Sequence, residues 1–145
     1  MQELGDPPRV RLRVLIVDDD EEIRATLRLL FEGEGYDVLE APDGLAALRI
    51  LRAVPNPLVV LSNHNMPRPD GPGLFSFVTE DPDLAQRHAY VYMTAGNRVI
   101  PPPLVRQLEA LSVPVLRKPF DIDDLIAVVE DASRRLEARD TAPGH

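Results

Sequence analysis

Cysteine is absent from the 145 residues, so the chain forms no disulfide and offers no thiolate for catalysis or metal binding. No apolar run approaches the length that is needed to span a bilayer. The first residues contain neither the basic region nor the apolar stretch of a signal peptide. Lysine is almost missing, because 15 of the 16 basic residues are arginine and the other is Lys118. The absence of cysteine, of a membrane-spanning run and of a signal peptide predicts a cytoplasmic protein with no membrane partner.

The balance of charge is acidic. A net charge of −8 argues against a protein that binds a phosphate backbone, since such binding rests largely on Lys and Arg. We therefore expect no nucleic-acid partner. Apolar residues make up 44% of the chain and charged residues 28%, which is ordinary for one globular domain of this length.

Apolar segments of strand length alternate with segments of helical periodicity. This alternation predicts an α/β fold in which parallel strands are joined by helical crossovers. Five helices are expected, beginning near Asp20, Gly44, Gly71, Pro101 and Asp121. The expected strands are 12–17, 36–39, 58–61, 89–93 and 113–116.

Polar segments follow four of the expected strands. Asp18 and Asp19 end the first, and Asn63 lies at the end of the third. Thr94 ends the fourth and Lys118 follows the fifth. In an open parallel sheet such ends converge on one edge. Capping of the next helix would explain Asp20, but not two adjacent carboxylates at the strand end; these could supply oxygen ligands for Mg²⁺.

In order and spacing, these segments resemble the receiver domain of two-component response regulators. The resemblance rests on the three acids 18–20, on Asn-His-Asn-Met-Pro at 63–67 with Asp-Gly at 70–71, on Met-Thr-Ala at 93–95 and on Arg-Lys-Pro-Phe at 117–120. It implies a doubly wound, flavodoxin-like sheet with strand order 2-1-3-4-5 and five helices on both faces. It also implies a role in phosphorelay signal transduction with a histidine kinase or another signalling protein as partner.

The resemblance also assigns roles at the site. The family accepts a phosphoryl group on an aspartate, and Asn63 stands at that position. Thr94 and Lys118 match the residues that sense the phosphoryl group, and Val115 stands where an aromatic ring usually rotates on activation. The implied Mg²⁺ ligands are Asp18, Asp19, Asn63 and the backbone carbonyl of Asn65.

Asn63 changes the expected chemistry. An amide is a very poor nucleophile, so no acyl phosphate is expected at this position. The site also loses one negative charge, so Mg²⁺ is expected to bind weakly. His64 could be imagined as a substitute acceptor, but no general-base partner for it is evident.

We expect a receiver domain at 10–138, flanked by mobile segments at 1–9 and 139–145. No residues remain for an output domain, so the expected function is that of a stand-alone, atypical receiver that acts as a protein-interaction module. The resemblance also implies that a homodimer could form through the fourth helix, the fifth strand and the fifth helix.

Two alternatives remain open. In the first, the chain is a conventional receiver in which Asn63 is an engineered replacement for aspartate. In the second, it is a small Mg²⁺-dependent phosphohydrolase of the haloacid dehalogenase type with Asp18 as nucleophile. The order Asp18, Thr94 and Lys118 superficially fits that family, but the chain lacks room for the usual cap after the first strand.

Overall fold

The structure is a computed structural model and describes residues 12–63 and 71–141. The predicted mobile segment 1–9, His64 and the carbonyl of Asn65 lie outside these residues. Within them, five segments form strands. They are β1 (Arg13–Val17), β2 (Asp37–Ala41), β3 (Leu58–Asn63), β4 (Ala89–Ala95) and β5 (Val115–Lys118).

The strands form one parallel sheet in the order β2-β1-β3-β4-β5, as predicted. The register pairs Val17 with Ser62 and Asn63 with Met93, so the carboxyl ends of the central strands lie at one edge. The order reverses between β1 and β3, which is the place where doubly wound sheets form their sites.

The described residues contain six helices, whereas the sequence predicted five. The additional helix, α4, is only six residues long, too short to show the apolar periodicity on which the prediction relied. Asp81 caps it, and Pro82 occupies its first position. The helices are α1 (Glu21–Gly33), α2 (Gly44–Ala53), α3 (Gly71–Thr79), α4 (Pro82–Arg87), α5 (Pro102–Ala110) and α6 (Ile122–Thr141).

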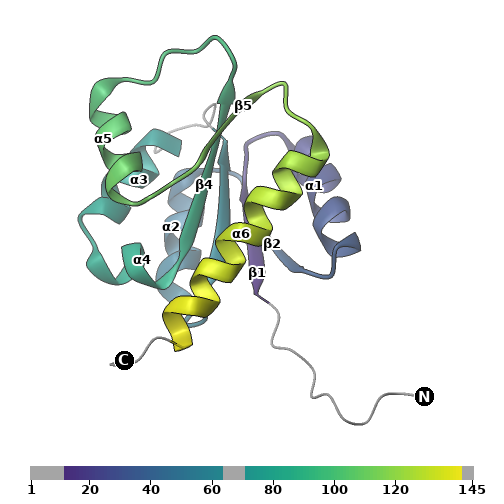
Figure 1. Cartoon of the computed structure of the whole chain (residues 1–145), viewed down its shortest axis with the longest axis horizontal. Coiled ribbons are helices and arrows are strands. Elements are labelled where there is room, and N and C mark those ends of the chain that lie inside the picture. Colours follow the sequence, from purple (N-terminus) through teal and green to yellow (C-terminus); the bar gives the residue numbers. More distant parts are fainter. Residues whose placement is uncertain (1–11, 64–70, 142–145) are drawn as a thin grey trace.

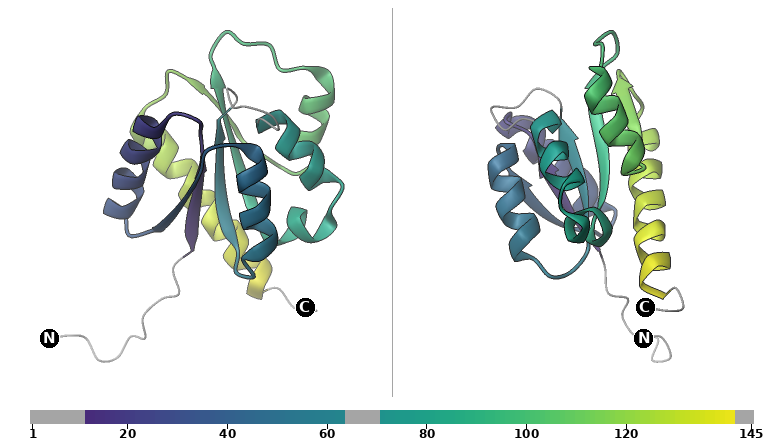
Figure 2. Two further views of the ribbon diagram at one scale, coloured as in Figure 1. Left: turned by 180° about the vertical axis from the view of Figure 1, so that it is seen from behind. Right: turned by 90° about the vertical axis from the view of Figure 1, so that its left-hand side faces the viewer.

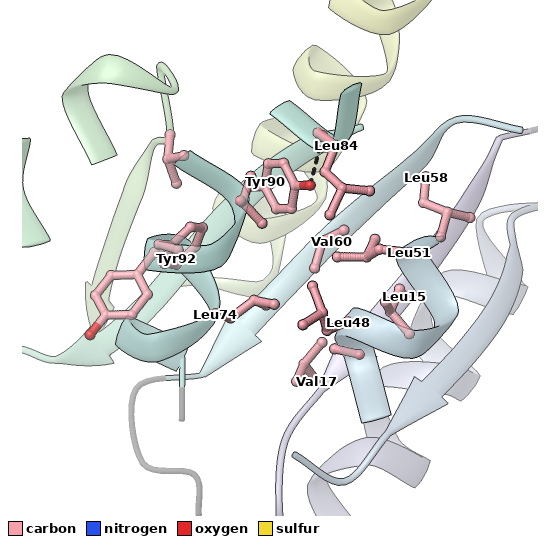
Figure 3. Packing of buried hydrophobic residues seen from close by; sticks show 14 of the residues in the cluster. Leu15, Val17, Leu48, Leu51, Leu58, Val60, Leu74, Leu84, Tyr90 and Tyr92 are labelled. Carbon is pink, nitrogen blue, oxygen red and sulfur yellow. Dashed lines mark hydrogen bonds between the residues drawn. The ribbon is translucent and has the colours of Figure 1, made fainter. Parts of the chain in front are cut away.

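Two hydrophobic layers hold the helices against the sheet. Helices α1 and α6 cover one face, where Phe31 and Leu125 pack on Ile16 and Leu61 (Figures 1 and 2). Helices α2, α3, α4 and α5 cover the other. Figure 3 shows the centre of that second layer, where Leu, Val and Tyr side chains interdigitate and the Tyr90 hydroxyl donates to the carbonyl of Leu84. Each strand of the centre is thus buried on both faces, which explains its continuous apolar sequence.

The loop between β4 and α5 is fixed against the end of β5. The Lys118–Pro119 peptide bond is cis, and Gly96 lies directly against the carbonyl of Lys118. A Cβ atom at Gly96 would be 2.4 Å from that oxygen, so only glycine permits this approach. In addition, Arg117 donates to the carbonyl of Arg98 at 2.9 Å. The segments that carry Thr94 and Lys118 are therefore held together.

The last helix continues to Thr141, past the domain end predicted at residue 138. Leu125, Val129, Ala132 and Leu136 of this helix are buried against the sheet. Among the helices that the structure describes, none combines the length and the apolar character that crossing a membrane requires.

Candidate functional site

The centre of the candidate site is a direct contact between Asn63 and Asp18. The amide nitrogen Nδ2 of Asn63 donates to Oδ2 of Asp18 at 2.7 Å. A carboxylate can only accept, so the amide group must turn its nitrogen toward Asp18. Both residues are buried, with 4% of Asn63 and none of Asp18 exposed. The end of β1 is thus joined to the end of β3 by a charge-assisted hydrogen bond.

The second oxygen of Asp18 is also engaged. Its Oδ1 accepts from the backbone N–H of Asp20 at 2.9 Å, which fixes the turn between β1 and α1. Asp20 in turn caps α1, accepting from the backbone N–H groups of Glu22 and Ile23. The three consecutive acids therefore have different surroundings, because Asp18 is buried whereas Asp19 and Asp20 are exposed.

Arg24 lies behind this turn and was not identified from the sequence. Its Nη1 donates to the backbone carbonyl of Asp18 at 2.6 Å, and its Nε donates to Glu40 on β2 at 3.0 Å. Glu40 also accepts from Arg28 at 2.6 Å, and this bond is the main reason why the pKa of Glu40 is lowered. The guanidinium of Arg24 thus brings a fixed positive charge close to Asp18. No sequence pattern indicates this contact, since Arg24 occupies an ordinary polar position of an amphipathic helix.

The other predicted residues lie at the ends of β4 and β5. Thr94 is buried, and its hydroxyl has no hydrogen-bond partner among the described residues. Lys118 is half-buried and forms no ion pair within residues 12–63 and 71–141. Val115 begins β5 and is 36% exposed. The structure therefore joins Asp18 to Asn63 directly, and it places Thr94 and Lys118 on adjacent strands nearby without a direct bond to either.

The residues present do not form a complete Mg²⁺ site in this arrangement. Magnesium requires near-octahedral coordination by oxygen. Both carboxylate oxygens of Asp18 already accept hydrogen bonds, and Asn63 presents nitrogen rather than oxygen to Asp18. In the described part of the chain, no three His, Cys, Asp or Glu side chains are grouped closely enough to hold a metal. The bond between Asn63 and Asp18 has to open before a cation can be bound between them.

A doubly wound sheet with acids, a hydroxyl and a lysine at its carboxyl edge defines a class of α/β signalling domain. A family model described as the response regulator receiver domain matches residues 14–130. The chain belongs to this family, and it is a receiver domain of two-component signalling.

Relatives differ in length. The "Probable chemotaxis protein CheY" of Rhizobium etli is 32% identical over 122 residues, which cover 83% of this chain and 91% of that protein. The "Regulatory protein AtoC" of Escherichia coli is 32% identical and the "Response regulator MprA" of Mycobacterium avium 31% identical. This chain covers only 25% and 55% of those two proteins.

Solved structures have the same fold. A CheY-like receiver domain from Methanospirillum hungatei JF-1 has a TM-score of 0.70 at 26% identity, over 88% of this chain and 96% of that one. The receiver domain of the Francisella response regulator 1452 has a TM-score of 0.72 at 27% identity, over 86% and 98%.

Proposed function

We propose that this receiver acts as a protein-interaction module that carries no phosphoryl group on residue 63. The observation that supports this most strongly is the hydrogen bond from Asn63 to Asp18. An aspartate at this position would place two carboxylates side by side and would need a cation between them. The amide instead donates to Asp18 directly, so the pocket is held closed without a cation or a covalent phosphate.

Receiver domains bind Mg²⁺ in general. For this chain we propose only weak binding, in the millimolar range. The ligands would be Asp18, Asp19, the amide oxygen of Asn63 and the backbone carbonyl of Asn65. Binding competes with the Asn63–Asp18 hydrogen bond and with the hydrogen bond from Asp20, which accounts for the low affinity.

We also propose that the site transmits its state to α5 and β5 less strongly than the usual receiver site does. Thr94 and Lys118 stand at the positions that sense a phosphoryl group, but Val115 has no ring that could rotate toward Thr94. The β4–α5 loop is clamped to β5 by the contacts of Gly96 and Arg117. These features favour one resting conformation of α5 and β5 and only a small rearrangement on input.

Partners are proposed to be a histidine kinase or another signalling protein in the cytoplasm, and not nucleic acid, in view of the net charge of −8. A homodimer could use α5, β5 and α6, which correspond to the predicted fourth helix, fifth strand and fifth helix. On that face Arg117 is exposed, and Asp131 pairs with Arg134 and Arg135 of its own helix. The face therefore offers both signs of charge.

Hydrolase activity is not part of the proposal. A nucleophilic Asp18 would have to be reachable by a substrate, but Asp18 is buried and both of its oxygens accept hydrogen bonds. We expect the purified protein to turn over p-nitrophenyl phosphate no faster than the Asp18→Asn variant. Metal-dependent turnover that disappears in Asp18→Asn would favour the phosphohydrolase alternative.

The main test is incubation with acetyl phosphate and Mg²⁺, followed by intact-mass and peptide mass spectrometry. We expect no acid-labile phosphate on residue 63 of the parent protein. The matched Asn63→Asp variant should become labelled if Asp18, Asp19, Thr94 and Lys118 are suitably placed. Labelling of the parent on Asp18, Asp19 or His64 would contradict the proposal, because a different acceptor would then operate.

A further inference from the structure

A groove lies at the end of the molecule opposite the candidate site. Figure 1 shows α4 and the C-terminal end of α6 at this lower end, whereas the β4–α5 and β5–α6 loops lie at the top. The groove has a volume of about 850 Å³. It is lined by Pro55, Pro57, Asp83, Ala85, Gln86, Arg87, Ala110, Leu111, Ser112, Leu136 and Arg139.

Arg139 brings a positive charge into the groove. Arg139 donates through Nη1 to the carbonyls of Gln86 at 3.0 Å and His88 at 3.1 Å, so its position is fixed. Among the side chains of residues 12–63 and 73–139, no carboxylate forms an ion pair with it. The other arginine of the groove, Arg87, is paired with Asp83. The groove therefore presents one fixed positive charge that no carboxylate of its lining balances, in a chain that is acidic overall.

Ser112, which also lines the groove, has an unusual backbone conformation. It follows the C-terminal end of α5 with a φ of 56°, the left-handed conformation that usually selects glycine at this position. The helix end is closed by the N–H of Ser112 on the carbonyl of Glu109 and by the N–H of Val113 on that of Leu108. A serine here costs backbone strain that glycine would avoid, but it provides the groove with a hydroxyl group.

We propose that this groove binds an extended peptide segment of a partner protein whose C-terminal carboxylate is held by Arg139 and Ser112. A carboxylate matches the planar guanidinium fork, and the hydroxyl adds a further donor. The apolar walls from Pro55, Pro57, Leu111 and Leu136 suit an aliphatic side chain beside that carboxylate. The groove is not enclosed, so the residues that precede the C-terminal carboxylate can extend out of it toward the rest of the partner.

The test is a ¹⁵N NMR titration of the whole protein with acetyl-Ala-Leu-Leu, compared with the same peptide ending in an amide. We expect saturable shifts at the amides of residues 110–112 and at the side chain of Arg139. The free carboxylate should bind at least tenfold more tightly than the amide. Equal binding of the two peptides, or shifts that do not saturate, would overturn the proposal.

Three variants separate binding from folding. Arg139→Gln should weaken binding at least tenfold, whereas Arg134→Gln, an exposed arginine of the same helix outside the groove, should leave it unchanged. Ser112→Gly relieves the positive φ and so should fold at least as well as the parent. It should nevertheless weaken binding by about threefold through the lost hydroxyl. Undiminished binding in both Arg139→Gln and Ser112→Gly would show that the carboxylate is held elsewhere.

Discussion

Asn63 and Asp18 are joined by a hydrogen bond of 2.7 Å that links the ends of β3 and β1 within the buried part of the molecule. Aspartate at residue 63 would turn this attraction into a repulsion between two carboxylates. We therefore expect that the choice between an amide and a carboxylate at residue 63 decides whether the two strand ends need a cation between them. This contact and three others in the structure have measurable consequences.

The first prediction concerns Asn63→Asp in metal-free buffer. The variant loses a donor to Asp18 and gains a second buried negative charge, so its free energy of unfolding should fall by about 2 kcal/mol. Added Mg²⁺ should return more stability to the variant than to the parent, because a ligand stabilises the state that binds it more tightly. Chemical denaturation of both proteins with and without Mg²⁺ measures this. Equal stability of both proteins, with no response to Mg²⁺, would show that residue 63 does not face a cation pocket.

The second prediction concerns Arg24. Replacement by Gln removes the bond to the carbonyl of Asp18 and the ion pair with Glu40, both partly shielded from water. We expect a loss of about 1 to 2 kcal/mol in the free energy of unfolding. Arg49→Gln, at an exposed position of α2, is the matched control and should change stability by less than about 0.5 kcal/mol. Similar losses in the two variants would mean that Arg24 has no special role beside Asp18.

The third prediction concerns pH. His88 is fully buried, with Nδ1 accepting from the N–H of Leu58 and Nε2 next to the carbonyl of Leu51. Burial is the main cause that lowers the pKa of His88 from 6.5 to about 4. The unfolded chain therefore takes up the proton first as pH falls. The contribution of His88 to stability is complete above pH 6.5, and about 3 kcal/mol of it is lost between pH 6.5 and 4.

The matched variant for this effect is His88→Gln, whose amide can accept from Leu58 and donate to Leu51 without titrating. Denaturation midpoints measured from pH 7 to pH 4.5 should fall more steeply for the parent than for the variant. The pKa of Glu40 is also lowered from its usual value of 4.5. The stability that Glu40 contributes is lost only below that pH, so it leaves most of the range from pH 7 to pH 4.5 unaffected. Parallel pH profiles would show that His88 is not the titrating group.

The fourth prediction compares two glycines. A Cβ at Gly96 would meet the backbone carbonyl of Lys118, which cannot move without displacing β5. Gly96→Ala should therefore lower the free energy of unfolding by about 1 to 3 kcal/mol. A Cβ at Gly33, at the end of α1, would meet no atom within 4 Å, so Gly33→Ala should be neutral or stabilising by up to about 1 kcal/mol. If both variants keep the parent's stability in thermal unfolding, the close approach of Gly96 to Lys118 does not exist in solution.

Features that depend on neighbouring residues in the sequence were predicted, whereas contacts between residues far apart in the sequence were not. Alternating apolar runs located all five strands, and the resemblance gave their order, since both depend on patterns that are visible along the chain. Helix α4 was missed because six residues contain too few turns for a periodic pattern, although the Asp81–Pro82 pair is a helix-start signal. The burial of His88 and the contact of Arg24 with Asp18 depend on residues that meet only in the folded state.

The sequence predicted which strand ends meet at one edge of the sheet, but not the contacts between their side chains. From the position of Asn63 we predicted that the usual chemistry is lost, which the labelling experiment tests. The sequence did not indicate that its amide donates to Asp18. The orientation of the amide depends on how closely the ends of β1 and β3 approach each other, which only the folded structure shows. The groove around Arg139 had no sequence signal at all, because its lining comes from four separate segments.

The most direct test of the central claim is amide hydrogen exchange of the parent and of Asn63→Asp, each with and without acetyl phosphate and Mg²⁺. Intact mass recorded on the same samples reports phosphorylation. If the Asn63–Asp18 bond holds the pocket in one state, the parent should remain unlabelled and the exchange of α5 and β5 should not change. Asn63→Asp should become labelled and show a measurable but small change there, because Val115 lacks a ring. A parent protein whose α5 and β5 respond to the phosphodonor would contradict the account.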